Sequence, residues 1–414
     1  MRLWLTFDGS FIMKITYVSN YINHHVKPLC DILYKELSED FVFVETSPMT
    51  AERKKLGWRT DEDVPYLKRL YEKEQKNDIE SLISESDILM LGWSELSFEL
   101  VKKRILSKKI TLRLSERIYK EGQWKFISPG GLISKYKEHI KWNKYPVYML
   151  CIGGYTAADF RLIHAYKNKL FRWGYFTKTE DTKLSQWDNT RKIKICWAGR
   201  MMDLKHPEYV LSAYNKLLSP LSREEKEGYQ LVMIGDGALR GGLEKYVREN
   251  KLEKYVKFTG NIKPHEVRAQ MESSHIFVMT SNYLEGWGAV INEAMNSGCA
   301  VLSSDEAGAT PYLIKDNING YSYKSGSYKE FEKKFLNLFK TDISELKIRA
   351  VNGKNTVSTL WSEKNAAKRL LEFCGLLLKN EKPVIYDDDG PLSKAPYIKA
   401  PGILRTLREK NKQD

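Results

Sequence analysis

The sequence has few features of a metalloprotein, a disulfide-bonded secreted protein or a membrane-spanning protein. No apolar run approaches the ~18 residues that a membrane span needs, and the first twelve residues do not resemble a secretory signal, so we take Met13 as the native start. The seven histidines never stand at metal-ligand spacing near a cysteine, so no metal site is expected. The cysteines lack C-x-x-C spacing, which predicts reduced thiols in the cytoplasm; they are Cys30, Cys151, Cys196, Cys299 and Cys374.

The charge of the chain favours phosphate-rich partners without choosing among them. Its 67 basic and 53 acidic residues give a net charge of +14. The lysines are spread along the whole chain, which is also typical of a solvated surface. No nucleic-acid-binding motif accompanies the charge, so a nucleic-acid partner is not expected.

The chain alternates short apolar runs with amphipathic stretches, which predicts parallel sheets covered by helices on both faces. At 414 residues it is long enough for two such domains. We therefore predict an α/β fold with two doubly wound, Rossmann-like domains facing each other across a cleft. The expected strands are 15–19, 41–46, 88–93, 110–114 and 147–153, then 193–199, 230–237, 256–260, 276–281 and 300–304.

The predicted boundaries follow changes in composition along the chain. Residues 1–172 form the first domain and 191–360 the second. Within the stretch 170–192, which becomes polar and lacks a clear period, residues 173–190 are interpreted as the linker. Residues 361–379 form an amphipathic helix that can pack back on the first domain. A mobile, basic tail is expected over residues 380–414.

Polar residues follow three strands of the second domain, where open α/β sheets bind ligands. The first segment runs from Gly199 and Arg200 to Lys205, ahead of a helix expected from Pro207 to Leu218. The planar fork of an arginine and the point charge of a lysine together suit a diphosphate. Two ordinary surface cations are the alternative interpretation.

The second segment, Gly235-Asp-Gly237, is a weak signal. A Gly-x-Gly turn after a strand can approach a nucleotide, and it is equally a tight connection between a strand and a helix. The longer G-x-G-x-x-G pattern is absent, because Arg240 occupies the position of its third glycine.

The third segment is Glu285-Gly-Trp-Gly288 followed by Glu293, with a helix expected to begin near Gly288 or Ala289. The N–H groups of residues 286–288 are donors at a helix start, and carboxylates accept hydrogen bonds from sugar hydroxyls. A helix-terminal charge and a solvated glutamate are the alternative. The glycines beside Trp287 favour a ligand site.

The order of these motifs resembles that of glycosyltransferase family 4, the group 1 retaining glycosyltransferases with a GT-B fold. The resemblance covers roughly 130 residues and includes Phe258-Thr-Gly260 and Gly298-x-Ala-Val. It implies that Arg200 and Lys205 hold a donor diphosphate, that Glu285 lies beside the donor sugar and that Glu293 binds the ribose. The remaining donor contacts that it implies are Gly199, Gly235, the backbone near Ile262, Gly286, Trp287 (a variant of the usual phenylalanine) and Gly288.

The first domain matches the family less well. The glycine-rich first loop of many relatives reads Ser19-Asn-Tyr-Ile-Asn-His-His25 in this chain, and Glu116 stands near the position of a sugar-facing histidine. The resemblance leaves open whether His24, His25 or Glu116 faces the sugar or acceptor. A buried, hydrogen-bonded structural histidine is the alternative for His24 and His25.

The activity implied by the resemblance is retaining, metal-independent transfer of a sugar from a nucleotide-diphosphate donor, without a cofactor. The implied acceptor is a glycan or lipid-linked oligosaccharide of surface polysaccharide biosynthesis, and the enzyme would be cytoplasmic and peripheral at the inner face of the plasma membrane. Apolar and basic residues near 403–410 fit an anionic membrane surface. The alternatives are a non-catalytic glycosyltransferase-like subunit of a partner enzyme and a GT-B sugar-nucleotide epimerase.

Overall fold

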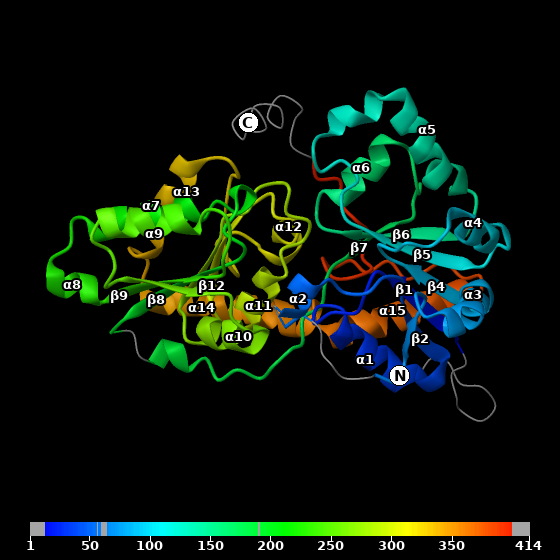
Figure 1. Cartoon of the computed structure of the whole chain (residues 1–414), viewed down its shortest axis with the longest axis horizontal. Coiled ribbons are helices and arrows are strands. Elements are labelled where there is room, and N and C mark those ends of the chain that lie inside the picture. The colour runs from blue at the N-terminus through cyan, green and yellow to red at the C-terminus, as the bar shows by residue number, and fades with distance from the viewer. Residues whose placement is uncertain (1–12, 56, 59–63, 189–190, 400–414) are drawn as a thin grey trace. The chain divides into compact units, whose positions relative to one another are not determined.

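The computed structural model describes residues 13–55, 57–58, 64–188 and 191–399 (Figure 1). The described chain divides into two compact units. The first unit contains residues 13–178 and 361–399, and the second unit contains residues 179–360. The boundary at residues 178 and 179 falls within the segment that the sequence assigns to a linker.

The first unit is built on a seven-stranded parallel sheet of order β3-β2-β1-β4-β5-β6-β7. Its central strands are almost wholly buried because helices cover both faces, as expected for a parallel sheet. The strands are β1 (Ile15–Ser19), β2 (Phe41–Glu45), β3 (Leu67–Arg69), β4 (Ile88–Leu91), β5 (Ile110–Ser115), β6 (Val147–Ile152) and β7 (Leu170–Trp173). The helices are α1 (Lys27–Leu37), α2 (Ala51–Lys55), α3 (Lys76–Glu85), α4 (Phe98–Leu106), α5 (Pro129–Glu138), α6 (Thr156–Leu162) and α15 (Glu363–Leu378).

The second unit has a six-stranded parallel sheet of order β10-β9-β8-β11-β12-β13. The strands are β8 (Ile193–Ala198), β9 (Tyr229–Ile234), β10 (Val256–Gly260), β11 (Ile276–Met279), β12 (Ala300–Ser304) and β13 (Tyr321–Tyr323). Its helices are α7 (Pro207–Leu218), α8 (Arg223–Glu227), α9 (Arg240–Glu249), α10 (Pro264–Glu272), α11 (Val290–Asn296), α12 (Thr310–Leu313), α13 (Tyr328–Leu338) and α14 (Ile343–Asn355). The helix expected at 207–218 has those bounds, and Val210, Leu211 and Tyr214 are buried as its pattern predicts.

The predicted fold class is confirmed, since both sheets are doubly wound and a long helix follows the second. The sequence analysis missed three short strands, β3, β7 and β13. Trp173, the first residue of the predicted linker, is instead the last residue of the edge strand β7 (Leu170–Trp173), in which Leu170, Phe171 and Trp173 are buried. The five cysteines are free thiols, and all of them are buried.

Helix α15 returns to the first unit after the second sheet is complete. Ser362 caps its start by accepting a hydrogen bond from the N–H of Asn365 at 3.1 Å. The ring of Phe373 then packs edge-on against Phe171 and Tyr148 of the first sheet, with centroids 4.9 and 5.7 Å away. Burial of this apolar stripe fixes α15 on the first unit.

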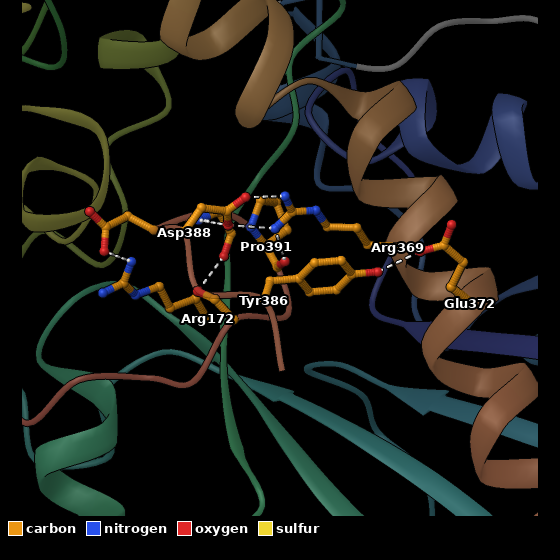
Figure 2. Close-up of polar contacts among 9 residues, drawn as sticks. Arg172, Arg369, Glu372, Tyr386, Asp388 and Pro391 are labelled. Atoms are coloured by element: carbon orange, nitrogen blue, oxygen red, sulfur yellow. Dashed lines mark hydrogen bonds and ion pairs between the residues drawn. The ribbon is translucent and has the colours of Figure 1, made fainter. Parts of the chain in front are cut away.

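The segment after α15 is ordered on the first unit, so the expectation of a mobile tail was wrong for residues 386–395. The backbone of Arg172 and that of the segment exchange hydrogen bonds, from Leu392 N to Arg172 O and from Arg172 N to Ser393 O. Figure 2 shows Arg369 of α15 reaching Asp388 at 2.8 Å, while the Tyr386 hydroxyl donates to Glu372 at 2.6 Å. The predicted membrane-binding residues near 403–410 lie outside the described residues.

Among the described residues, no helix combines the length and the apolar content that crossing a bilayer requires.

Candidate functional site

The second sheet reverses its strand order between β8 and β11, which are neighbours although β9 and β10 come between them in the chain. Loops that leave such a pair at the carboxyl edge diverge to opposite faces of the sheet and leave a ligand crevice. The loop after β8 carries Arg200 and Lys205, and the loop after β11 carries Glu285. The topology therefore brings together the cations and the carboxylate that the sequence predicted as donor contacts.

Lys205 and Glu285 form an ion pair between these two loops, and both side chains are mostly buried. The Thr280 hydroxyl donates to the Lys205 carbonyl at 2.6 Å, and the N–H of Asn282 donates to the carbonyl of Leu204 at 2.9 Å. The two loops are thus fixed to each other by backbone as well as by charge.

Arg200 is exposed, and its guanidinium makes no hydrogen bond or ion pair with the residues that the structure describes. It stands directly after Gly199 at the end of β8, in the same loop as Lys205. Five N–H donors are therefore presented to solvent at the switch point, where an anionic ligand can reach them.

Gly235 lets the loops after β8 and β9 touch. Its φ is +121°, and a Cβ there would lie 2.0 Å from the Gly199 carbonyl oxygen, so a side chain does not fit. The Gly199 N–H donates to Ile234 and the Gly235 N–H donates to Gly260, at 3.0 and 2.9 Å. Gly199 and Gly235 therefore allow these two loops to pack closely at the carboxyl edge of the sheet. Ile262, which follows Gly260 in the next loop, is partly buried.

Residues 285–288 form a turn ahead of α11. The helix begins at Val290, slightly later than the sequence suggested, with Gly288 at a φ of +88°. The Trp287 side chain is buried, and its indole N–H donates to Asn292 at 2.8 Å. Trp287 therefore supports the Gly286 and Gly288 backbone from beneath by packing, a role that the sequence motif did not reveal.

The sequence analysis missed the loop after β12, which packs against this turn. A Cβ on Gly308 would lie 1.8 Å from the Gly286 carbonyl oxygen, and the N–H of Ala309 donates to the Trp287 carbonyl at 2.8 Å. Polar residues directly after the strand at 300–304 were the available signal, since the same pattern marked the other loops.

Glu293 stands in the first turn of α11 and is partly buried. Burial raises the pKa of its carboxyl group to about 7, and the nearby positive charge of Arg268 opposes that shift in part. Near neutral pH the group therefore exists in both protonation states. Only the ionised state is purely an acceptor for sugar hydroxyls.

In the first unit, Tyr175 joins the three candidates that the sequence left open. Its hydroxyl donates to Glu116 at 3.1 Å, and its ring stacks on His25 at 6.4 Å. The rings of His24 and His25 are 3.8 Å apart, and burial lowers the pKa of both, that of His24 to about 4 and that of His25 well below its ordinary value. Both histidines therefore stay neutral near pH 7, and His25 and Glu116 share one neighbourhood.

Trp93 was not singled out by the sequence analysis. It follows β4 at the switch point of the first sheet, where β4 and β1 are neighbours, and 82% of its side chain is exposed. Its carbonyl accepts a hydrogen bond from Ser19 at the end of β1. An exposed indole at the carboxyl edge of a parallel sheet is a ready platform for a ring-shaped ligand.

Both units therefore belong to the class of doubly wound α/β domains. Residues 179–356 match the family model of glycosyl transferases group 1. The matched segment lies within the second unit and covers less than half of the chain. The finer assignment to family 4 stays a prediction.

Two curated relatives each match less than half of the chain. An uncharacterized glycosyltransferase of Methanocaldococcus jannaschii is 28% identical over 189 residues, which are 46% of this chain and 46% of that protein. The amylovoran biosynthesis glycosyltransferase AmsK of Erwinia amylovora is 29% identical over 24% of this chain and 25% of its own length. The matches thus span about half, or less, of the length of these relatives.

Solved structures resemble the chain over most of its length. HepE of Anabaena, in complex with UDP, has a TM-score of 0.62 at 15% identity, over 89% of this chain and 100% of that chain. A glycosyltransferase from Rickettsia africae has a TM-score of 0.59 at 15% identity, covering 89% and 99%. At this identity the likeness shows a shared fold.

Proposed function

We propose that the protein transfers a sugar, with retention of anomeric configuration, from a nucleotide-diphosphate donor to a glycan or lipid-linked acceptor. The observation that carries the proposal is the Lys205–Glu285 pair beside Arg200, at the switch point of a group 1 glycosyl transferase domain. A diphosphate needs cations and a sugar needs hydrogen-bond acceptors. A donor that spans the two loops would meet both.

In this proposal Arg200 and Lys205 stabilise the departing diphosphate, and Glu285 orients the donor sugar. The acceptor hydroxyl forms a bond to the anomeric carbon on the face from which the diphosphate leaves. The bond from that carbon to the diphosphate breaks, and a donor phosphate oxygen takes the acceptor proton. Fixed cations and amide dipoles then supply electrostatic stabilisation and positioning, so we propose that transfer needs no metal ion.

We assign the nucleoside to the neighbouring loops of the same edge. Glu293 would bind the ribose hydroxyls, and the backbone near Ile262 would meet the base. The glycines around the turn, Gly286 and Gly288, would let the donor approach the peptide N–H groups.

We assign the acceptor to the first unit. Trp93 offers an apolar platform, and the Glu116, Tyr175 and His25 cluster offers polar contacts. A curated relative of Campylobacter jejuni, 29% identical over 30% of this chain, is named for a glycan on PP-undecaprenol. By analogy we propose a glycan or lipid-linked acceptor of surface polysaccharide biosynthesis, reached from the cytoplasmic face of the membrane.

The test is a screen of the purified protein against a panel of nucleotide sugars with chelator present, measuring release of nucleoside diphosphate. The proposal expects release from one donor without added metal, and a product of unchanged anomeric configuration by NMR. Inverted product would refute retention, and strict dependence on added metal would refute metal independence. If the protein binds a nucleotide sugar but releases no nucleoside diphosphate, whichever donor or acceptor extract is supplied, a non-catalytic subunit would be favoured.

A further inference from the structure

Helix α5 of the first unit exposes apolar side chains that the fold does not use. None of its ten residues is buried by the described residues. Leu132, Ile133 and Tyr136 are 37%, 58% and 56% exposed, and Ile127, just before the helix, is 65% exposed. Figure 1 shows α5 on the outside of the first unit, beyond β5 and β6.

The three apolar residues of α5 lie on one face of the helix. Positions 132, 133 and 136 fall within about 100° of arc at 3.6 residues per turn. A surface helix ordinarily turns such a stripe toward the core, as α6 does with Ala157, Ala158 and Phe160. The stripe of α5 faces solvent instead, so it lacks a role in packing this unit. An exposed apolar patch of this kind marks an interaction surface.

The charge around this face identifies its partner. Residues 121–146 contain five lysines, no arginine and two acidic residues. Glu121 pairs with Lys125, and Glu138 pairs with Lys135 at 3.0 Å, so the excess positive charge comes from Lys137, Lys141 and Lys144. His139 adds no charge near pH 7, because burial lowers its pKa to about 4.

Lys141 extends the surface to α4. Its ammonium group lies over the rings of Trp142 and Phe98, at 4.3 and 4.8 Å from their centroids. Phe98 opens α4 and is partly exposed. We call Ile127, Leu132, Ile133 and Tyr136, with the lysines of residues 122–146, the α5 surface.

This composition favours a bilayer over a protein partner. Lysine is depleted in protein interfaces, where arginine is enriched, whereas lysines around apolar residues are typical of helices on anionic membranes. Tyrosine also prefers the membrane–water interface. We propose that the α5 surface docks the protein onto an anionic lipid bilayer, with its apolar side chains at the acyl boundary and its lysines among the headgroups.

The benefit of docking rests on the proposed function, since a lipid-linked acceptor is confined to a membrane. Binding to the bilayer itself requires no turnover. Vesicle binding and sugar transfer can therefore fail independently of each other.

The test is sedimentation of the full chain with vesicles of phosphatidylglycerol and phosphatidylcholine, compared with pure phosphatidylcholine. We expect preferential binding to the anionic vesicles that weakens in high salt. The double variant Leu132→Ser with Ile133→Ser should lower the partition coefficient about tenfold or more. Its control is Ile348→Ser, because Ile348 is 57% exposed on α14 of the second unit.

Charge is tested separately with Lys137→Glu and Lys144→Glu together, which should weaken binding to anionic vesicles by roughly thirtyfold. The matched control is Lys254→Glu with Lys257→Glu, two exposed lysines of the second unit. Thermal unfolding verifies that each variant is folded. Wild-type protein that binds neither vesicle, or variants that bind like wild type, would overturn the proposal. Self-association through the α5 surface in place of vesicle binding would assign it to a second copy.

Discussion

At the residue scale, Lys205 and Glu285 hold each other between the loops after β8 and β11. The pair keeps a cation and a carboxylate at the same point of the sheet edge without a ligand. Each group is then available to a donor that offers both phosphate oxygens and sugar hydroxyls. The carboxylate should matter for turnover more than for folding, because the loops are also joined by backbone hydrogen bonds.

Glu285→Gln tests this division. We expect kcat to fall about 100-fold, since a neutral amide stabilises developing positive charge poorly, while the thermal unfolding midpoint changes little. The control is Glu249→Gln, which removes a surface pair with Lys245 on α9 and should leave kcat unchanged. Near-normal turnover of Glu285→Gln would remove this residue from the site.

Glu293 gives a pH prediction of definite sign. Its folded-state pKa is raised to about 7, so the folded state binds a proton more tightly than the unfolded chain. Ionisation of Glu293 therefore lowers the stability of the folded state as pH rises from about 4.5 through 7. We expect Glu293→Gln to raise the unfolding midpoint at pH 8 more than at pH 5.

Binding of the donor's nucleoside diphosphate should show the opposite trend at the same residue. In the wild type, affinity should increase as pH rises through about 7, because in the proposed complex the ionised carboxylate accepts hydrogen bonds from both ribose hydroxyls. The rise should be absent in Glu293→Gln. Calorimetric titration between pH 5.5 and 8.5 measures both, and identical profiles would separate Glu293 from the ribose.

At the element scale, glycines set how closely the loops of the second unit approach. Gly308→Ala would place a methyl group against the Gly286 carbonyl and push the 285–288 turn away from its position. We expect a large loss of affinity for the donor's nucleoside diphosphate and of turnover. Gly241→Ala is the control, because a Cβ there meets nothing within 4 Å in the first turn of α9. That change should leave the fold at least as stable as the wild type. Equal activity of the two variants would contradict the role of the Gly308 contact.

Most elements that surround the site could be predicted from the sequence. Continuous apolar runs identified the strands β8 to β12, and Pro207 with its apolar face identified α7. The pair between Lys205 and Glu285 could not be derived from the residues alone, because it depends on β8 and β11 being neighbours. The Gly308 contact and Tyr175 were missed for the same reason, since each acts through a residue far away in the chain. The short edge strand β7 was missed because four residues carry too little periodicity.

At the scale of the whole molecule, the chain completes its first unit only after finishing the second. Helix α15 and residues 386–395 pack on the first sheet, and Arg369 links both through Asp388 and Tyr386 (Figure 2). The first unit therefore depends on the C-terminal segment, whereas the segment that matches the group 1 glycosyl transferase model is continuous in sequence.

Arg369→Ala tests this dependence. We expect a loss of about 2 kcal/mol in the free energy of unfolding, since a mostly buried guanidinium and its charged partner lose their hydrogen bonds. Lys368→Ala, on the exposed side of the same helix, should change stability by less than about 0.5 kcal/mol. Denaturant unfolding measures both. Equal stability of the two variants would mean that the segment after α15 does not hold the first unit together.

The central claim is that Arg200 and Lys205 stabilise the diphosphate that leaves during sugar transfer. The most direct measurement is the rate of nucleoside diphosphate release by Arg200→Ala and Lys205→Ala, each compared with wild type and with Lys257→Ala as an exposed control. We predict that each of the two variants loses about 100-fold or more in kcat while Lys257→Ala does not. Unchanged release in both Arg200→Ala and Lys205→Ala would contradict the account.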